Sequence, residues 1–199
     1  YPTPFRSPLD PPIYHIAGLD YGTSNATAVV LCAVNPSKWP QIRVVDEYYY
    51  DSKKEGRSKT DAELANDIVK FIDGVENLQA FYVDPSAASL KQELRNRDIT
   101  VLDAKNDVLT GIRTCAKFFF SKSLVVHQKC SNLIEGIQSY SWDQKASLRG
   151  EDRPLKVNDH SVDALRYAIS SKFSNGRIDA GEEIPLHLLR REVYGEDPM

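Results

Sequence analysis

Three β-rich runs joined by short turns constrain the architecture of this chain more than any other feature of its sequence. The runs cover residues 13–21, 26–34 and 41–50, and residues such as Gly22, Asn25 and Asn35 separate them with turn-forming chemistry. Links this short have no room for the crossover that parallel neighbours need, so the runs predict an antiparallel meander.

Helix and strand patterns alternate after the meander. Thr60 and Glu63 have the spacing of a capping box and predict a helix that begins there with one apolar face. Apolar periodicity predicts further helices over 86–97, 107–121, 131–140 and 159–172, with Asp159 as the N-cap of the last, and short strands over 78–83, 100–102 and 124–127. The 107–121 helix is expected to turn Val108, Ile112, Cys115 and Phe119 inward.

This order of elements predicts an α/β fold with a mixed sheet of about five or six strands and helices on both faces. It fits a ribonuclease H-like fold. We expect residues 13–175 to form this domain, the proline-rich residues 1–12 to be an extended linker, and residues 176–199 to be an acidic tail. No apolar run is long enough to span a bilayer, so no membrane contact is expected.

Charge and cysteine usage exclude two classes of protein. The net charge of −3 argues against a protein that coats nucleic acid through bulk positive charge. Three widely spaced cysteines exclude a zinc finger. Residues 91–129 nevertheless hold eight Lys and Arg against four acids, so any contact with nucleic acid is expected to be local.

Acidic residues end two of the predicted strands, and a third lies in the last helix. Asp20 and Asp84 follow apolar runs, at strand ends where open α/β sheets bind ligands. Asp163 lies within an apolar stripe, with His160 three residues earlier on roughly the same helix face. If the fold clusters these carboxylates, their repulsion calls for divalent cations such as Mg²⁺ or Mn²⁺, which prefer oxygen ligands.

Each of these residues also has a purely structural interpretation. Asp20 could bond backbone amides in a turn, and Asp84 could cap the helix that follows it. Asp163 could be an exposed acid paired with Arg166, and His160 could simply be a helix-start residue.

Five segments resemble the C-terminal nuclease domain of tailed-phage terminase large subunits. They cover residues 18–22, 82–89, 106–113, 133–143 and 158–167, and the segment that includes His160, Asp163 and Tyr167 is the most specific. The resemblance implies a ribonuclease H-like core in which two divalent cations, Mn²⁺ or Mg²⁺, are bound by Asp20, Asp84 and Asp163. His160 would ligate an ion or orient the attacking water.

The same resemblance implies an endonuclease that cuts double-stranded viral DNA concatemers during packaging in the host bacterial cytoplasm. Its partners would be an ATPase domain earlier in the same polypeptide, the small terminase subunit and the portal protein. Lys105, Arg113 and Lys117 would contact DNA phosphates, although a solvated helix face explains each of them equally well.

Three other interpretations remain open at this point. Residues 19–25 resemble the first phosphate loop of the actin and sugar-kinase superfamily, which suggests a nucleotide-binding phosphotransferase, although no second such loop follows. Resolvases and transposases share the ribonuclease H-like fold and its metal chemistry. The acids could also merely cap and pair within an interaction module that has no catalytic role.

Overall fold

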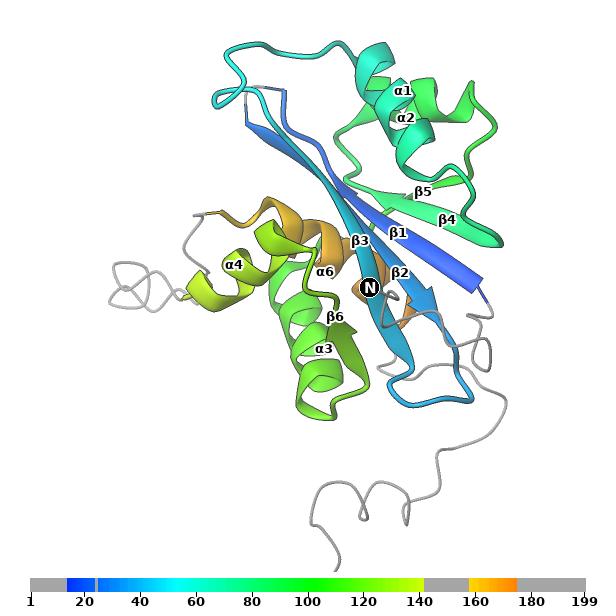
Figure 1. Cartoon of the computed structure of the whole chain (residues 1–199), viewed down its shortest axis with the longest axis vertical. Helices are drawn as coiled ribbons and strands as arrows, with labels where there is room; N and C mark the ends of the chain where they lie inside the picture. Colours follow the sequence, from blue (N-terminus) through cyan, green and yellow to red (C-terminus); the bar gives the residue numbers. More distant parts are fainter. Residues whose placement is uncertain (1–13, 24, 142–157, 175–199) are drawn as a thin grey trace, which may run out of the picture.

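A six-stranded mixed sheet forms the centre of the computed structural model, which describes residues 14–23, 25–141 and 158–174 (Figure 1). The strand order is β5-β4-β1-β2-β3-β6. The strands are β1 (Tyr14–Asp20), β2 (Ala26–Val34), β3 (Ile42–Asp51), β4 (Leu78–Val83), β5 (Val101–Asp103) and β6 (Leu124–Val126). β2 is antiparallel to both β1 and β3, while the β1–β4, β4–β5 and β3–β6 pairs are parallel.

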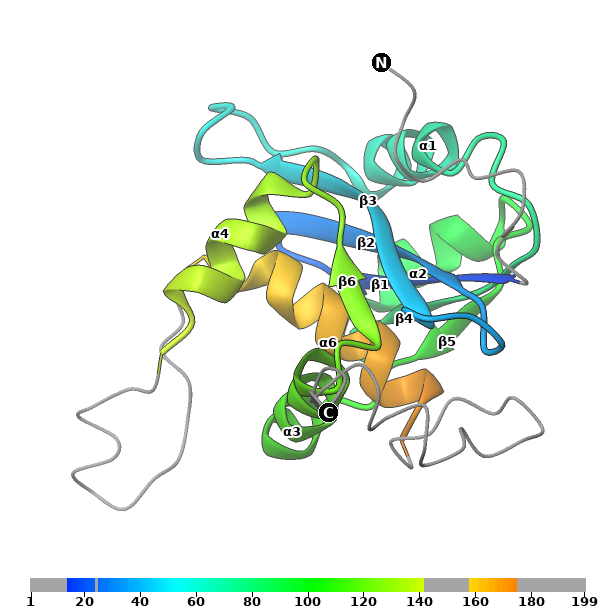
Figure 2. The same cartoon turned by 60° about the horizontal axis from the view of Figure 1, so that its bottom comes forward.

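Helices cover both faces of this sheet (Figures 1 and 2). They are α1 (Asp61–Phe71), α2 (Ala88–Arg95), α3 (Val108–Phe120), α4 (Ser131–Ser139) and α6 (His160–Lys172). α1 and α2 pack in one core cluster, and α3, α4 and α6 pack in the other. The predicted α/β fold, the meander and the number of strands are therefore confirmed.

Alternation along β1 divides its side chains between the two cores. Ile16 faces the cluster with α6, whereas Ala17 and Leu19 face α1 and α2. Gly18 lies against α6, where a Cβ atom would be 1.8 Å from the carbonyl oxygen of Ala164. The absence of a side chain at this position lets α6 lie directly on the strand that ends in Asp20.

The expected inward face of α3 is partly wrong. Val108 is 36% exposed, and the buried positions of the helix are Gly111, Thr114 and Phe118. α3 packs on α6, and Gly111 leaves space there for the side chain of Arg166. Cys115 and Phe119, two of the expected inward residues, are partly buried and pack against the core, so the prediction fails at Val108.

Asp159 occupies the N-cap position of α6, as expected, but its side chain makes no capping hydrogen bond. Its backbone is in the right-handed helical region, with φ −91° and ψ −6°, whereas N-cap residues usually adopt extended angles. The predicted N-cap residue is therefore confirmed, although its side chain forms no cap.

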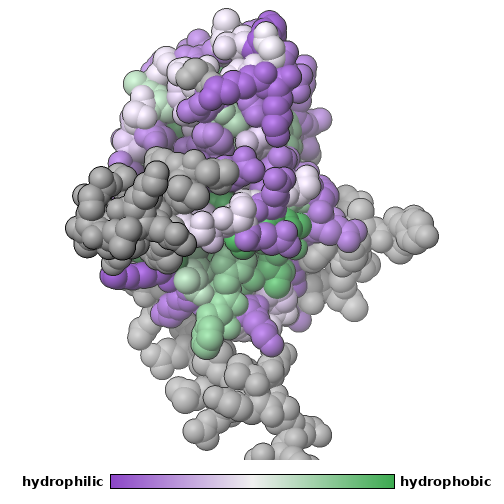
Figure 3. All heavy atoms as spheres, turned by 90° about the vertical axis from the view of Figure 1, so that its left-hand side faces the viewer, coloured by the Kyte–Doolittle hydropathy of each residue, from purple (hydrophilic) through white to green (hydrophobic). Residues whose placement is uncertain are grey.

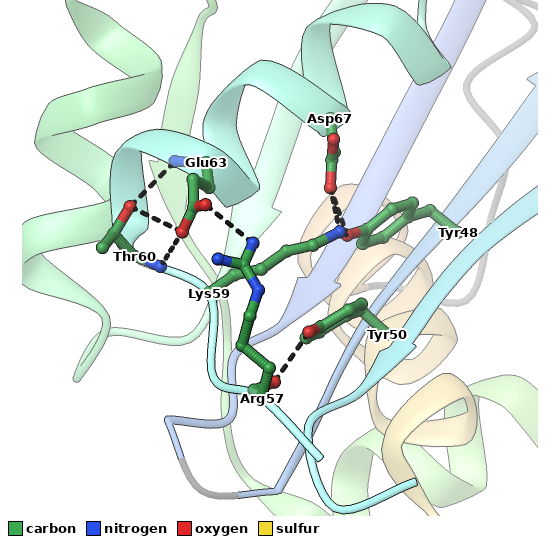
Figure 4. A network of polar contacts seen from close by, with 7 residues as sticks. All are labelled: Tyr48, Tyr50, Arg57, Lys59, Thr60, Glu63 and Asp67. Atoms are coloured by element: carbon green, nitrogen blue, oxygen red, sulfur yellow. Dashed lines mark hydrogen bonds and ion pairs between the residues drawn. The ribbon is translucent and has the colours of Figure 1, made fainter. Parts of the chain in front are cut away.

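A network of polar side chains fixes the connection between β3 and α1 (Figure 4). Thr60 and Glu63 form the expected capping box, with Glu63 N donating to Thr60 Oγ1 at 3.2 Å. Arg57 forms an ion pair with Glu63 at 2.7 Å. Lys59 forms an ion pair with Asp67, and its Nζ lies 3.9 Å from the centroid of the Tyr50 ring. These contacts anchor the start of α1 to the sheet.

The end of α6 meets the beginning of β1. Lys172 Nζ lies 4.9 Å from the centroid of the Tyr14 ring and donates to Oε1 of Gln79 at 2.8 Å. α6 therefore runs along β1 in the opposite direction, from Asp20 back to Tyr14.

The expected linker over residues 1–12 and the acidic tail over residues 176–199 lie outside the described residues. Within the described ranges, no helix has the length and apolar character that a membrane span requires.

Candidate active site

Asp20 and His160 meet at the carboxyl end of β1. Asp20 is the last residue of this strand and His160 is the first residue of α6. Nδ1 of His160 donates to Oδ2 of Asp20 at 2.8 Å. The hydrogen bond to Asp20 and the nearby negative charges outweigh burial and raise the pKa of His160.

Asp163 lies one turn further along α6 and is held by Arg166. Both Nε and Nη2 of Arg166 approach the same oxygen of Asp163, Oδ1, at 3.0 and 2.9 Å. Only 16% of the Asp163 side chain and 4% of the Arg166 side chain are exposed. Burial raises the pKa of Asp163, and the charges of Asp20 and Asp159 add to this effect while Arg166 opposes it. Asp20 and Asp163 are thus close enough to interact electrostatically.

Asp84 follows β4 and is held from two directions. Oδ1 accepts from the backbone N of Ser86 at 2.8 Å and from its hydroxyl at 2.7 Å, and Oδ2 accepts from the hydroxyl of Tyr167 at 2.9 Å. Burial raises the pKa of Asp84, but these hydrogen bonds and the charge of Arg166 together outweigh it, so the pKa lies below its usual value.

The donor chemistry of this group suits a hard cation, although the present arrangement is not a closed metal site. Within the described ranges, no three His, Cys, Asp or Glu side chains are arranged to hold an ion. In that same part of the chain, Oδ1 of Asp20 and Oδ2 of Asp163 have no hydrogen-bond partner. Carboxylate oxygens are the ligands that Mg²⁺ and Mn²⁺ prefer. Joint ligation by Asp20, Asp84, Asp163 and His160 stays a prediction.

The structural alternatives for the three acids fare differently. Asp20 bonds the imidazole of His160 rather than the amides of a turn. Asp84 bonds Ser86, which precedes Ala87, the N-cap residue of α2, and so it does not cap that helix. Asp163 is paired with an arginine, as the alternative held, but the pair is buried rather than exposed.

Comparison with known proteins identifies the family. The chain is 31% identical over 160 residues to the terminase large subunit of Escherichia phage T5, a match that covers 78% of this chain and 35% of that protein. The large terminase of a thermophilic bacteriophage, solved in complex with ATP-γ-S, is 40% identical, with a TM-score of 0.77 over 81% of this chain and 41% of that one. The chain belongs to the phage terminase large subunits.

This terminase chain spans roughly two-fifths or less of the length of the large subunits it matches. Its fold is that of their nuclease domains: the large terminase nuclease of thermophilic phage G20c, solved with bound magnesium, is 13% identical and has a TM-score of 0.60. That match covers 79% of this chain and 80% of the G20c chain. No protein-family model matches the sequence. The match to terminase large subunits therefore favours the terminase family over the resolvases and transposases that share the ribonuclease H-like fold.

Sequence reasoning did not assign three residues that shape the terminase site. Arg166 and Tyr167 hold Asp163 and Asp84, respectively. Glu47 of β3 accepts from the backbone N of Asn132 at 2.7 Å and of Leu133 at 2.9 Å, and thereby caps α4. Arg166 lies three residues after Asp163 in an apolar stripe, which was a usable signal. Glu47 gave no signal, because its partners lie more than 80 residues away.

The three candidate DNA-contacting cations of the terminase are all exposed. Lys105 precedes α3, and Arg113 and Lys117 lie on it. Asn106, next to Lys105, accepts from Nη1 of Arg166 through its carbonyl at 3.4 Å, so this segment borders the acids. On the side of the molecule that carries α3 and α4, hydrophobic residues gather in one patch with hydrophilic residues around it (Figure 3). Contact of these cations with DNA stays a prediction.

Proposed function

We propose that this terminase chain is a divalent-metal-dependent endonuclease that cuts double-stranded viral DNA concatemers during genome packaging. The observation that supports the proposal is that Asp20 at the end of β1 and Asp163 of α6 lie close enough to interact electrostatically, while Asp84 follows β4, which is parallel to β1. Among the described residues, Asp20 and Asp163 each have one carboxylate oxygen without a hydrogen-bond partner, which a cation could bind. The magnesium bound to the G20c nuclease supports the choice of ion.

Asp20, Asp84 and Asp163 would hold two Mg²⁺ or Mn²⁺ ions. Such ions lower the pKa of a bound water and stabilise the oxygen that leaves during in-line displacement at phosphorus. The hydrogen bond to Asp20 uses Nδ1 of His160 as the donor, which leaves Nε2 as the nitrogen that can accept a proton. His160 would therefore ligate an ion or orient the attacking water through Nε2, while Asp20 keeps the ring in place.

Lys105, Arg113 and Lys117 would bind backbone phosphates beside the acids. Contacts of this kind carry no base specificity and weaken as salt concentration rises. We therefore expect cutting with little sequence preference, and specificity supplied by partners.

The large subunits that this chain matches are more than twice as long as the matched part, which suggests that further domains belong to the same polypeptide. We propose that it follows an ATPase domain in the same polypeptide, to which residues 1–12 connect it. It would act with the small terminase subunit and the portal protein in the cytoplasm of the host bacterium.

Plasmid cleavage with Mn²⁺, Mg²⁺, Ca²⁺ or chelator tests the activity. We expect cleavage with Mn²⁺ or Mg²⁺ and none with chelator. Asp20→Ala, Asp84→Ala and Asp163→Ala should each lose more than about 100-fold, since loss of an outer-shell partner alone typically costs 10–100-fold. The matched control is Asp73→Ala, an exposed acid after α1, which should cut like the wild type. Cleavage that survives chelation, or wild-type cleavage by one of the three acid variants, would contradict the proposal.

A further inference from the structure

Arg166 is a buried arginine with a partner for each part of its guanidinium group. Two nitrogens reach Asp163, Nη1 lies 3.4 Å from the carbonyl oxygen of Asn106, and Cζ lies 4.6 Å from the centroid of the Tyr167 ring. A buried charge is costly unless it is paired and hydrogen-bonded, and here those conditions are met. The guanidinium is consequently held in one orientation.

Helix α3 has a glycine where it contacts the aliphatic part of the Arg166 side chain. Gly111 lies inside α3, where glycine is less favourable than alanine. A Cβ atom at this position would be 2.6 Å from Cγ and 2.8 Å from Cδ of Arg166. The absence of a side chain at Gly111 therefore admits the Arg166 stem between the two helices.

Arg166 and Tyr167 are consecutive residues of α6, and each holds one acid of the candidate site. Arg166 directs both of its short hydrogen bonds to Oδ1 of Asp163, and among the described residues Oδ2 has no hydrogen-bond partner. Tyr167, whose ring stacks with the guanidinium, donates its hydroxyl to Asp84. One stacked pair thus joins an acid of α6 to an acid that follows β4.

We propose that Arg166 is a positioning residue for cation binding. It holds Asp163 through one oxygen so that the other can bind an ion, and it braces the tyrosine that holds Asp84. This inference rests on the proposed function, because it assumes that these acids bind a divalent cation.

An electrostatic role and a positioning role of Arg166 predict opposite changes in Mn²⁺ affinity when the arginine is removed. A positive charge beside the acids repels a divalent cation, so its removal would tighten Mn²⁺ binding if charge were its only effect. Loss of an outer-shell group that orients a ligand typically weakens metal affinity 10–100-fold. The direction of the change in affinity therefore distinguishes the two roles.

The test is a Mn²⁺ titration of the full chain, followed by the electron paramagnetic resonance signal of free Mn²⁺. We expect Arg166→Met and Arg166→Lys each to weaken binding 10–100-fold, because lysine keeps the charge but lacks the planar fork. Gly111→Ala keeps every site side chain and displaces the arginine stem, so it should weaken binding in the same direction. The matched control is Arg97→Met, which removes an arginine from its ion pair with Glu93 and should bind like the wild type.

Equal or tighter binding by Arg166→Met, or wild-type binding by Arg166→Lys, would overturn the positioning role. Circular dichroism checks that each variant folds, and if Arg166→Met does not fold, Arg166→Lys and Gly111→Ala decide. A wild-type chain that binds no Mn²⁺, or an Asp163→Ala variant that binds it normally, would instead overturn the proposed function. The two failures are therefore distinguishable.

Discussion

Replacing Gly18 by alanine should destabilise the domain, although glycine is a poor residue inside a strand. The added methyl carbon would lie 1.8 Å from the Ala164 carbonyl oxygen, 2.8 Å from its carbonyl carbon and 2.9 Å from the backbone nitrogen of Ala168. Non-bonded carbon and oxygen atoms rarely approach closer than about 3.3 Å. α6 would have to move away from β1 by roughly the difference, about 1.5 Å.

The size of the effect follows from two opposing contributions. Without the clash, alanine would stabilise the strand by about 0.5–1 kcal/mol relative to glycine. Overpacking costs about 1–3 kcal/mol, and the obstructing atoms belong to a helix backbone that cannot rotate aside, which places Gly18→Ala at the upper end. We expect a net loss of about 2 kcal/mol in the free energy of unfolding, small enough for the variant to fold.

Urea denaturation measures this loss, and proton NMR of His160 reports its consequence for the site. If α6 moves away, His160 separates from Asp20 and its pKa falls toward the ordinary value, because the hydrogen bond that raises it is lost. Ala164→Gly in the same chain should not restore stability, since the obstruction is the carbonyl oxygen and not the side chain. Gly56→Ala, where a Cβ atom meets open space but the backbone has φ +66°, should lose some stability and still leave the His160 pKa unchanged, because it does not touch α6. A Gly18→Ala variant as stable as the wild type would refute the reasoning.

Three further predictions concern local contacts. Glu47→Ala removes the acceptor for two backbone donors at the start of α4 and should cost about 2 kcal/mol in urea denaturation; a cost near zero would show that water replaces the carboxylate. Thr60→Ala breaks the capping box of α1 and should cost about 1 kcal/mol, whereas the exposed Ser131→Ala should cost much less. The backbone hydrogen bond from Thr60 is the largest cause that lowers the pKa of Glu63 from 4.5 to about 2. The ionised Glu63 therefore stabilises the fold above pH 4.5, and this stabilisation is lost as the pH falls toward 2. The melting temperature of Glu63→Gln should therefore change less with pH between about 2 and 4.5 than the melting temperature of the wild type does. An equal change in both proteins would contradict this role of Glu63.

The fold was largely predictable because its signals are local. Short links between β-rich runs permit only antiparallel neighbours, and the run over residues 26–34 coincides with β2. The rotation of α3 was not predictable in this way. Periodicity favoured Val108 as an inward residue, whereas the buried positions of α3 include Gly111, which lies against Arg166, a residue 55 positions away in the sequence.

The candidate site was predictable only in part. Strand ends and an apolar stripe pointed to Asp20, Asp84 and Asp163, and the first of these meets His160 across 140 residues of sequence. Nothing local indicates that such residues meet. Arginine is usually exposed, so Arg166 was considered only as a surface partner, and its burial follows from the packing of two helices.

The contact between Lys172 and Tyr14 has a mechanical consequence. The described core begins and ends at the same corner of the sheet, at the end of β1 opposite Asp20. Tension applied before Tyr14 enters β1 at that corner and loads in shear the hydrogen bonds that β1 forms with β2 and β4, whereas tension applied after Lys172 enters α6. Asp20 and His160 lie at the opposite ends of β1 and α6, so a pull applied at this corner enters the fold far from the candidate site.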